Sequence, residues 1–135
     1  MRSFLAVLLL CLSMTPLRAQ QAATAETGSQ FYVRYLAAVK AATTMEHVLA
    51  FWSQKAVQMY QSAPANQKMG FADIQGAYAS FGDINVVKET GTPTAATLTL
   101  GASFNGKKMT GTVYLVKEDG SWKLFGPENW VPATD

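Results

Sequence analysis

Apolar residues recur at helical spacing through the first half of the chain. Between residues 29 and 42 they fill one wide arc of a helical wheel: Phe31, Tyr32, Val33, Tyr35, Leu36 and Val39. Thr43 and Glu46 have the spacing of a capping box. The stretch from there to Ser62 carries a second apolar face, made of Met45, Val48, Leu49, Trp52, Ala56, Met59 and Tyr60. The pattern predicts one helix over 29–42 and another from Thr43 to Ser62.

A third helix is predicted between Pro64 and Ala79. Proline stops the preceding helix and suits the first turn of the next one. Apolar residues then follow at spacings of 3, 4 and 3, namely Phe71, Ile74, Tyr78 and Phe81.

After Gly82 the apolar residues alternate, which predicts four strands over 84–89, 95–104, 107–118 and 121–126. Asn105-Gly106 and Asp119-Gly120 are both dipeptides that favour two-residue hairpin turns. Such turns fix the register, with Phe104 opposite Lys107 and Lys117 opposite Trp122, and extend it to a pairing of Val113 with Gly126. Both hairpins then place the same kind of residue on one face: Leu98, Leu100, Ala102, Phe104, Met109, Val113, Leu115, Trp122 and Leu124.

An apolar sheet face needs a cover, and the three helices each supply an apolar arc. We therefore expect an α+β fold, with three N-terminal helices packed on one face of a four-stranded antiparallel meander. Trp122 is predicted to cover the inner face of the sheet.

The first nineteen residues predict export. Arg2 is followed by an uncharged apolar run from Phe4 to Met14, and Ala19 is a small residue suited to cleavage. The run is too short to cross a bilayer. We expect a signal peptide over 1–19, a flexible linker over 20–28 and a single domain over 29–135, in a periplasmic or secreted protein without membrane attachment after cleavage.

Loss of this leader changes the charge and removes the only cysteine. Of the eleven Lys and Arg residues, Arg2 and Arg18 leave, so nine cations face nine carboxylates. This balance gives no reason to expect nucleic-acid binding. Cys11 also leaves, which excludes thiol catalysis and cysteine-ligated zinc from the mature chain.

The segment VYLVKEDGSWKLFGPENW, residues 113–130, resembles the terminal hairpin of the nuclear transport factor 2-like (cystatin-like) fold, and the resemblance covers 30–130. It implies a curved, cone-like sheet that encloses a pocket together with the helices. Some members of that superfamily are isomerase- or cyclase-like enzymes, while others only bind. Five large aromatic residues are the ones we expect to line such a pocket and contact a ligand: Tyr35, Trp52, Tyr60, Tyr78 and Trp130.

No catalytic residue, metal site or cofactor is predicted. His47 is the only histidine and shares a helix face with glutamines, so a surface position is expected. Arg34 lies opposite the apolar arc of its helix. The resemblance implies that an isomerase would carry its base after the second helix, where SAPANQKMG has no carboxylate. We expect none of the nine carboxylates to face inward.

Three functions remain open. The preferred one is a non-catalytic exported domain that binds a small apolar ligand or a protein partner. The second is an isomerase- or cyclase-like pocket enzyme, which an apolar cavity with a buried carboxylate would favour. The third is an immunity- or inhibitor-like interaction module. The outer sheet face is the surface for that module and for a candidate homodimer.

Overall fold

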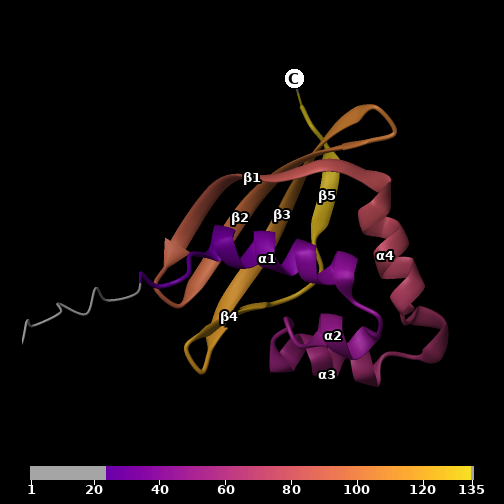
Figure 1. The fold of residues 1–135 in the computed structure, drawn as a ribbon, viewed down its shortest axis with the longest axis vertical. Coiled ribbons are helices and arrows are strands. Elements are labelled where there is room, and N and C mark those ends of the chain that lie inside the picture. Colours follow the sequence, from indigo (N-terminus) through magenta and orange to yellow (C-terminus); the bar gives the residue numbers. More distant parts are fainter. Residues whose placement is uncertain (1–23, 135) are drawn as a thin grey trace, which may run out of the picture.

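The computed structural model describes residues 24–134, and the helices come first in it, followed by one sheet (Figure 1). The helices are α1 (Gly28–Ala41), α2 (Met45–Leu49), α3 (Gln54–Ser62), the 3-10 turn η1 (Ala65–Gln67) and α4 (Phe71–Ser80). The strands are β1 (Phe81–Thr92), β2 (Ala95–Phe104), β3 (Lys107–Glu118), β4 (Ser121–Leu124) and β5 (Asn129–Pro132). The predicted leader and the start of the linker lie outside the described residues. No helix within 24–134 combines the length and apolarity needed to span a bilayer.

The sheet is antiparallel in the order β1-β2-β3-β4, and β5 also pairs with β3. The predicted bounds of β2 and β3 are confirmed. So is the register, with Phe104 opposite Lys107 and Lys117 opposite Trp122. Asn105 and Asp119 have φ of 49° and 50°, each followed by a glycine with positive φ, as this kind of two-residue turn requires.

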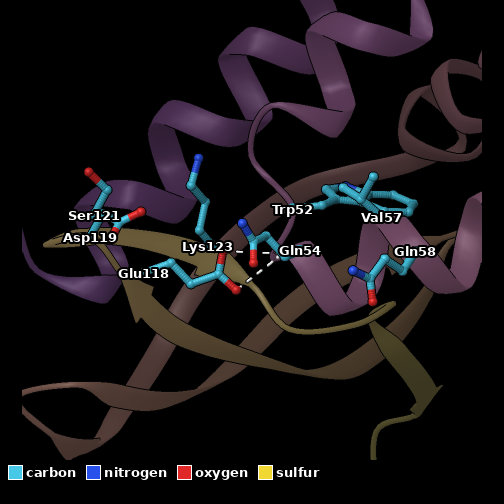
Figure 2. A pocket seen from close by; sticks show the side chains of 8 residues that line it. All are labelled: Trp52, Gln54, Val57, Gln58, Glu118, Asp119, Ser121 and Lys123. Carbon is cyan, nitrogen blue, oxygen red and sulfur yellow. Dashed lines mark hydrogen bonds between the residues drawn. The ribbon is translucent and has the colours of Figure 1, made fainter.

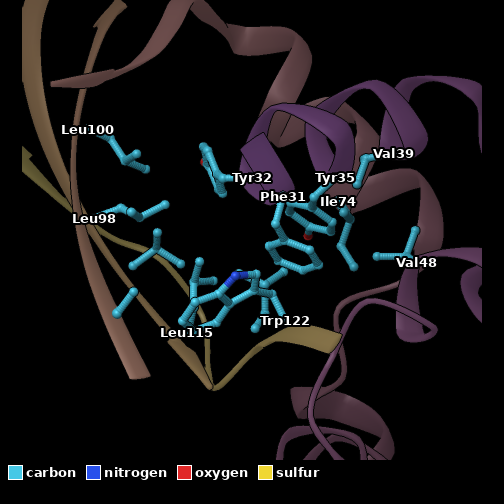
Figure 3. Packing of buried hydrophobic residues seen from close by; sticks show 13 residues of the cluster. Phe31, Tyr32, Tyr35, Val39, Val48, Ile74, Leu98, Leu100, Leu115 and Trp122 are labelled. Atoms are coloured by element: carbon cyan, nitrogen blue, oxygen red, sulfur yellow. The ribbon is translucent and has the colours of Figure 1, made fainter. Parts of the chain in front are cut away.

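Helix α1 lies across one face of this curved sheet (Figure 1), and Val48 of α2 and Ile74 of α4 join the same core, in agreement with the predicted α+β fold. Figure 3 shows the side chains that meet there: leucines of the sheet and Trp122 on one side, Phe31 and Tyr35 of α1 on the other. Trp122 is 6% exposed, so its predicted burial is confirmed. Its indole Nε1 donates to the carbonyl of Glu26 at 2.8 Å. Val33 was expected in the apolar arc of α1 but is 60% exposed.

The N-terminus of α1 is fixed by two sets of hydrogen bonds. Thr27 and Gln30 form a capping box. The carboxylate of Glu89 accepts from the backbone N–H groups of Gly28 at 3.0 Å and Ser29 at 2.9 Å, and from the Ser29 hydroxyl. Helix α1 therefore begins at Gly28, one residue before the predicted start of the first helix.

The prediction of one continuous second helix is wrong, because the chain breaks between α2 and α3. Ser53 N–H donates to the carbonyl of Leu124 at 2.8 Å, and Leu124 N–H donates to the carbonyl of Phe51 at 2.9 Å. This pairing with β4 pulls the backbone out of helical geometry. The buried Ser53 hydroxyl then caps α3 by accepting from Ala56 N–H at 3.2 Å. The predicted capping box at Thr43 is also absent, since α2 begins after Thr44 with no side-chain cap.

The third helix begins later and the first strand is longer than predicted. The chain after Pro64 makes only the short turn η1 before α4 starts at Phe71. Phe81, assigned to the helical face, instead opens β1 opposite Phe104. Their rings pack with centroids 5.1 Å apart.

The fifth strand was not predicted, and the expected pairing of Val113 with Gly126 is wrong. Leu115 pairs with Leu124, but the next pair on this edge joins Thr112 to Asn129. Two residues of β3 therefore face four residues, Phe125 to Glu128, that leave the ladder. Pro127 has no backbone N–H to donate to a ladder, which suits this excursion. The chain then returns as β5.

Candidate functional site

An apolar cavity of about 720 Å³ lies between α3, α4 and the region where β4 gives way to β5. All five residues predicted to contact a ligand line it: Tyr35, Trp52, Tyr60, Tyr78 and Trp130. They come from α1, the α2–α3 break, α3, α4 and β5. The structure therefore brings together aromatic residues that are up to 95 positions apart in the sequence.

These rings pack against one another in pairs. Trp52 and Tyr60 meet edge to face with centroids 5.8 Å apart, and Tyr35 and Tyr78 do so at 6.0 Å. Trp130 stacks on Phe81 at 4.7 Å. Such contacts add about 0.5–1.5 kcal/mol per pair beyond area burial and keep the walls in place. The cavity is partly open to solvent, because Met59, Met69 and Phe125 of its lining are exposed.

Trp130 requires the glycine opposite it on β3. A Cβ added at Gly111 would lie 2.7 Å from Cε3 of Trp130. The absence of a side chain at Gly111 therefore lets the indole lie flat on the inner sheet face, where it forms the wall next to β5.

Glu128 also lines the cavity, which corrects the expectation that no carboxylate faces inward. Trp122, Leu124 and Trp130 belong to strands and lie on the inner face, and Glu128 has the same two-residue spacing from Trp130. The excursion adds two residues, so it preserves this alternation. The predicted last strand ended at Gly126, two residues before Glu128, and the predicted inner face therefore did not include this carboxylate.

The Glu128 carboxylate accepts three hydrogen bonds. Oε1 accepts from the Tyr78 hydroxyl at 2.6 Å and the Tyr32 hydroxyl at 2.7 Å, and Oε2 accepts from the Trp130 indole Nε1 at 3.0 Å. These bonds connect α1, α4 and β5 at one point. A carboxylate has about four acceptor positions, so one remains open on Oε2.

The tyrosines form a chain of donors that ends at this carboxylate. The hydroxyls of Tyr35 and Tyr78 are 3.1 Å apart. A hydroxyl has one proton, and Tyr78 uses its proton on the shorter bond to Glu128. Tyr35 therefore donates to Tyr78.

Burial keeps all three phenols protonated. It raises the pKa of Tyr35 to about 12. It raises the pKa of Tyr32 and of Tyr78 further, and the negative charge of Glu128 adds to the rise in both. The phenols are neutral donors across the physiological pH range.

The indole N–H of Trp52 is a buried donor that makes no hydrogen bond in the described part of the chain. Its indole Nε1 approaches the Tyr35 hydroxyl closely enough to offset part of the pKa rise there. The contact falls outside hydrogen-bond geometry, so within residues 24–134 this nitrogen makes no hydrogen bond.

A second, polar cleft of about 570 Å³ shares Trp52 with the apolar cavity, and Figure 2 shows the side chains that line it. Two of its three charged side chains, Glu118 and Lys123, make hydrogen bonds to backbone groups. Both oxygens of Glu118 lie 3.1 Å from the backbone N–H of Gln54 at the start of α3, and Lys123 Nζ donates to the carbonyl of Ala50 at 2.6 Å.

The other polar candidates are surface residues. His47 is exposed on α2, as predicted. Arg34 pairs with Glu26 at 2.8 Å, and this hydrogen bond lowers the pKa of the Glu26 carboxyl. Across the described residues no three His, Cys, Asp or Glu side chains gather closely enough to hold a metal ion.

No protein-family model matches the chain, and no curated protein sequence matches it. Among solved structures, an NTF2-like protein of unknown function from Shewanella baltica is 14% identical, with a TM-score of 0.42, covering 80% of this chain and 99% of that one. Another, from Cytophaga hutchinsonii, is 12% identical, with a TM-score of 0.45, covering 82% of this chain and 94% of that one. Likenesses this distant say nothing about activity.

Proposed function

We propose that this protein binds a small, largely apolar molecule in the cavity between its helices and its sheet. The observation that carries the proposal is the cavity itself: about 720 Å³, lined by seven aromatic side chains and a single carboxylate. Ligand sites have this character, with mostly apolar walls and a few polar groups that fix orientation.

The engagement of Glu128 favours binding over catalysis. Three of its four acceptor positions are filled by protein donors, and these hydrogen bonds hold the carboxylate in one orientation. A general base must accept a proton from the substrate and pass it on. The structure around Glu128 instead resembles a fixed recognition group.

Calorimetric titration with apolar molecules, such as 1-decanol, tests this proposal. Saturable binding to the purified protein is expected, with a negative heat-capacity change. The variant Ala77→Phe fills the cavity from α4, since Ala77 lines it. Ala79→Phe is the matched control, because Ala79 is exposed on the same helix and does not line the cavity. Equal binding by both variants, or no binding by the wild type, would reject the cavity as the site.

A pocket enzyme is the second candidate, and Glu128 is the observation that favours it. The presence of a carboxylate in an apolar cavity is the feature that would support acid-base chemistry. An enolisation assay on apolar ketones tests this alternative. Turnover that disappears in Glu128→Gln while ligand binding persists would establish it and would overturn the non-catalytic proposal.

We also propose that the protein works outside the cytoplasm, on the strength of the leader predicted over residues 1–19. N-terminal sequencing of the exported protein should give a start near Gln20; a soluble cytoplasmic protein that retains Met1 would contradict this. A protein partner and a homodimer through the outer sheet face, where Tyr114 and Val131 are exposed, stay predictions.

A further inference from the structure

The donors that contact Glu128 are used within the cluster, and beside them the Trp52 indole Nε1 is a buried donor of the cavity wall that makes no hydrogen bond to any described residue. Tyr32, Tyr78 and Trp130 direct their protons to Glu128, and Tyr35 directs its proton to Tyr78. The open acceptor position on Oε2 of Glu128 remains. A ligand that complements this cluster must therefore bring a donor of its own.

No protein cation neutralises Glu128. Within residues 24–134 the only salt bridge joins Arg34 to Glu26, and neither of these residues lines the cavity. Lys55 is the one other charged residue that lines the cavity, and its ammonium lies 5.2 Å over the Phe125 ring. Lys55 is exposed, so water screens its charge. A negative charge thus stays unpaired inside a largely apolar hollow.

The walls also favour a positive charge. The faces of Trp, Tyr and Phe rings attract cations, most strongly when the cation is removed from water. Seven such rings line the same cavity as the Glu128 carboxylate. An acidic ligand would bring a second negative charge beside Glu128, and a neutral alcohol would gain a hydrogen bond without the charge attraction.

We propose that the ligand is a lipophilic amine, with its protonated nitrogen on Glu128 and its apolar body along the aromatic walls. This inference rests on the proposed function, because it names the class of molecule that the same cavity binds. The nitrogen donates to Oε2 of Glu128 in a charge-assisted hydrogen bond, which is about twice as strong as a neutral one.

Three probes with the same ten-carbon chain separate the headgroups: decylamine, 1-decanol and decanoate, each titrated into the full mature protein at neutral pH below its aggregation concentration. We expect decylamine to bind at least about tenfold more tightly than the other two, since about 1.4 kcal/mol corresponds to tenfold. In Glu128→Gln the amine preference over decanol should vanish while decanol binding persists. Glu46→Gln, an exposed change on α2, should keep the preference.

The outcomes distinguish this inference from the proposed function. Equal binding of decylamine and decanol would overturn the amine inference and leave the cavity as an apolar binding site. Preference for decanoate would also overturn it and would point to Lys55. Failure of all three probes to bind would overturn the proposed function as well. If circular dichroism shows that Glu128→Gln does not fold, the wild-type ratio of decylamine to decanol affinity decides alone.

Discussion

The inner face of the sheet has a filled end and an open end. At the filled end, Leu98, Leu100 and Leu115 are at most 1% exposed beneath α1 and Trp122. At the open end, Phe104, Met109 and Trp130 are only half-buried, and the cavity begins beside Trp130. Both ends continue the same alternating pattern.

The difference lies in what covers the two ends. At the filled end α1 lies directly on the sheet. At the open end the α2–α3 break and the four-residue excursion between β4 and β5 line a hollow instead of closing it. An apolar sheet face therefore becomes a filled core or the wall of a cavity according to its cover. Glu128 is placed at the end that stays open.

The largest expected effect is at the filled end. Trp122→Ala should lower the free energy of unfolding by about 3–5 kcal/mol, as truncation of a buried aromatic residue does. Chemical denaturation measures this. His47→Ala, on the exposed part of α2, should change it by no more than about 0.5 kcal/mol. Similar losses in both variants would contradict the described core.

Tyr78→Phe tests the hydrogen-bonded cluster at the open end. The substitution should lower the free energy of unfolding by about 1.5–3 kcal/mol, because it removes the 2.6 Å hydrogen bond to the charged Glu128. The same measurement on Tyr114→Phe provides the control, because Tyr114 is 53% exposed on the outer face. If the two variants are equally stable, the Glu128 cluster does not hold the helices to β5.

Gly111→Ala tests the wall formed by Trp130. The new Cβ would lie only 2.7 Å from the indole of Trp130. Overpacking of this kind should lower the free energy of unfolding, measured by chemical denaturation, by about 1–3 kcal/mol. Gly76→Ala is a control of opposite sign, since a Cβ there meets nothing within 4 Å and alanine favours a helix by about 0.5–1 kcal/mol. If both variants are destabilised, the effect comes from replacing a glycine and not from crowding of the Trp130 indole.

The smallest effect concerns acid stability. Partial burial opposes ionisation of Glu89, but hydrogen bonds from the Ser29 side chain and from the backbone of Ser29 and Gly28 outweigh it, so the pKa of Glu89 is lowered. A lowered pKa contributes stability above the unfolded value, about 4.3 for glutamate, that is lost as pH falls through the folded value. In Glu89→Gln the free energy of unfolding should therefore fall less steeply between about pH 5 and pH 2 than in the wild type, as chemical denaturation at each pH measures. The same pH dependence in both proteins would contradict the role of Glu89 at the start of α1.

The sequence predicted the parts of this fold that depend on neighbouring residues. The turns at Asn105-Gly106 and Asp119-Gly120 fix β2, β3 and their register locally, and the burial of Trp122 follows from that register. The break before α3 depends on pairing with Leu124, about 70 residues away, so helical periodicity could not show it.

The candidate site was predicted in part. The five aromatic residues expected at the ligand do line one cavity, because large aromatics on inward faces meet where the cover is incomplete. Glu128 was missed, although its two-residue spacing from Trp130 indicated its direction. The excursion that carries it depends on the sheet edge rather than on local pattern.

One measurement tests the binding cavity most directly. The chain has three tryptophans, and their indole N–H signals can be followed separately in a ¹H–¹⁵N spectrum. Trp52 and Trp130 line the cavity, whereas Trp122 is buried at the filled end. Titration with decylamine or 1-decanol should shift the Trp52 and Trp130 signals saturably and leave the Trp122 signal in place. Unchanged Trp52 and Trp130 signals up to the solubility limit of both probes, or an equal shift at Trp122, would contradict the cavity as a ligand site.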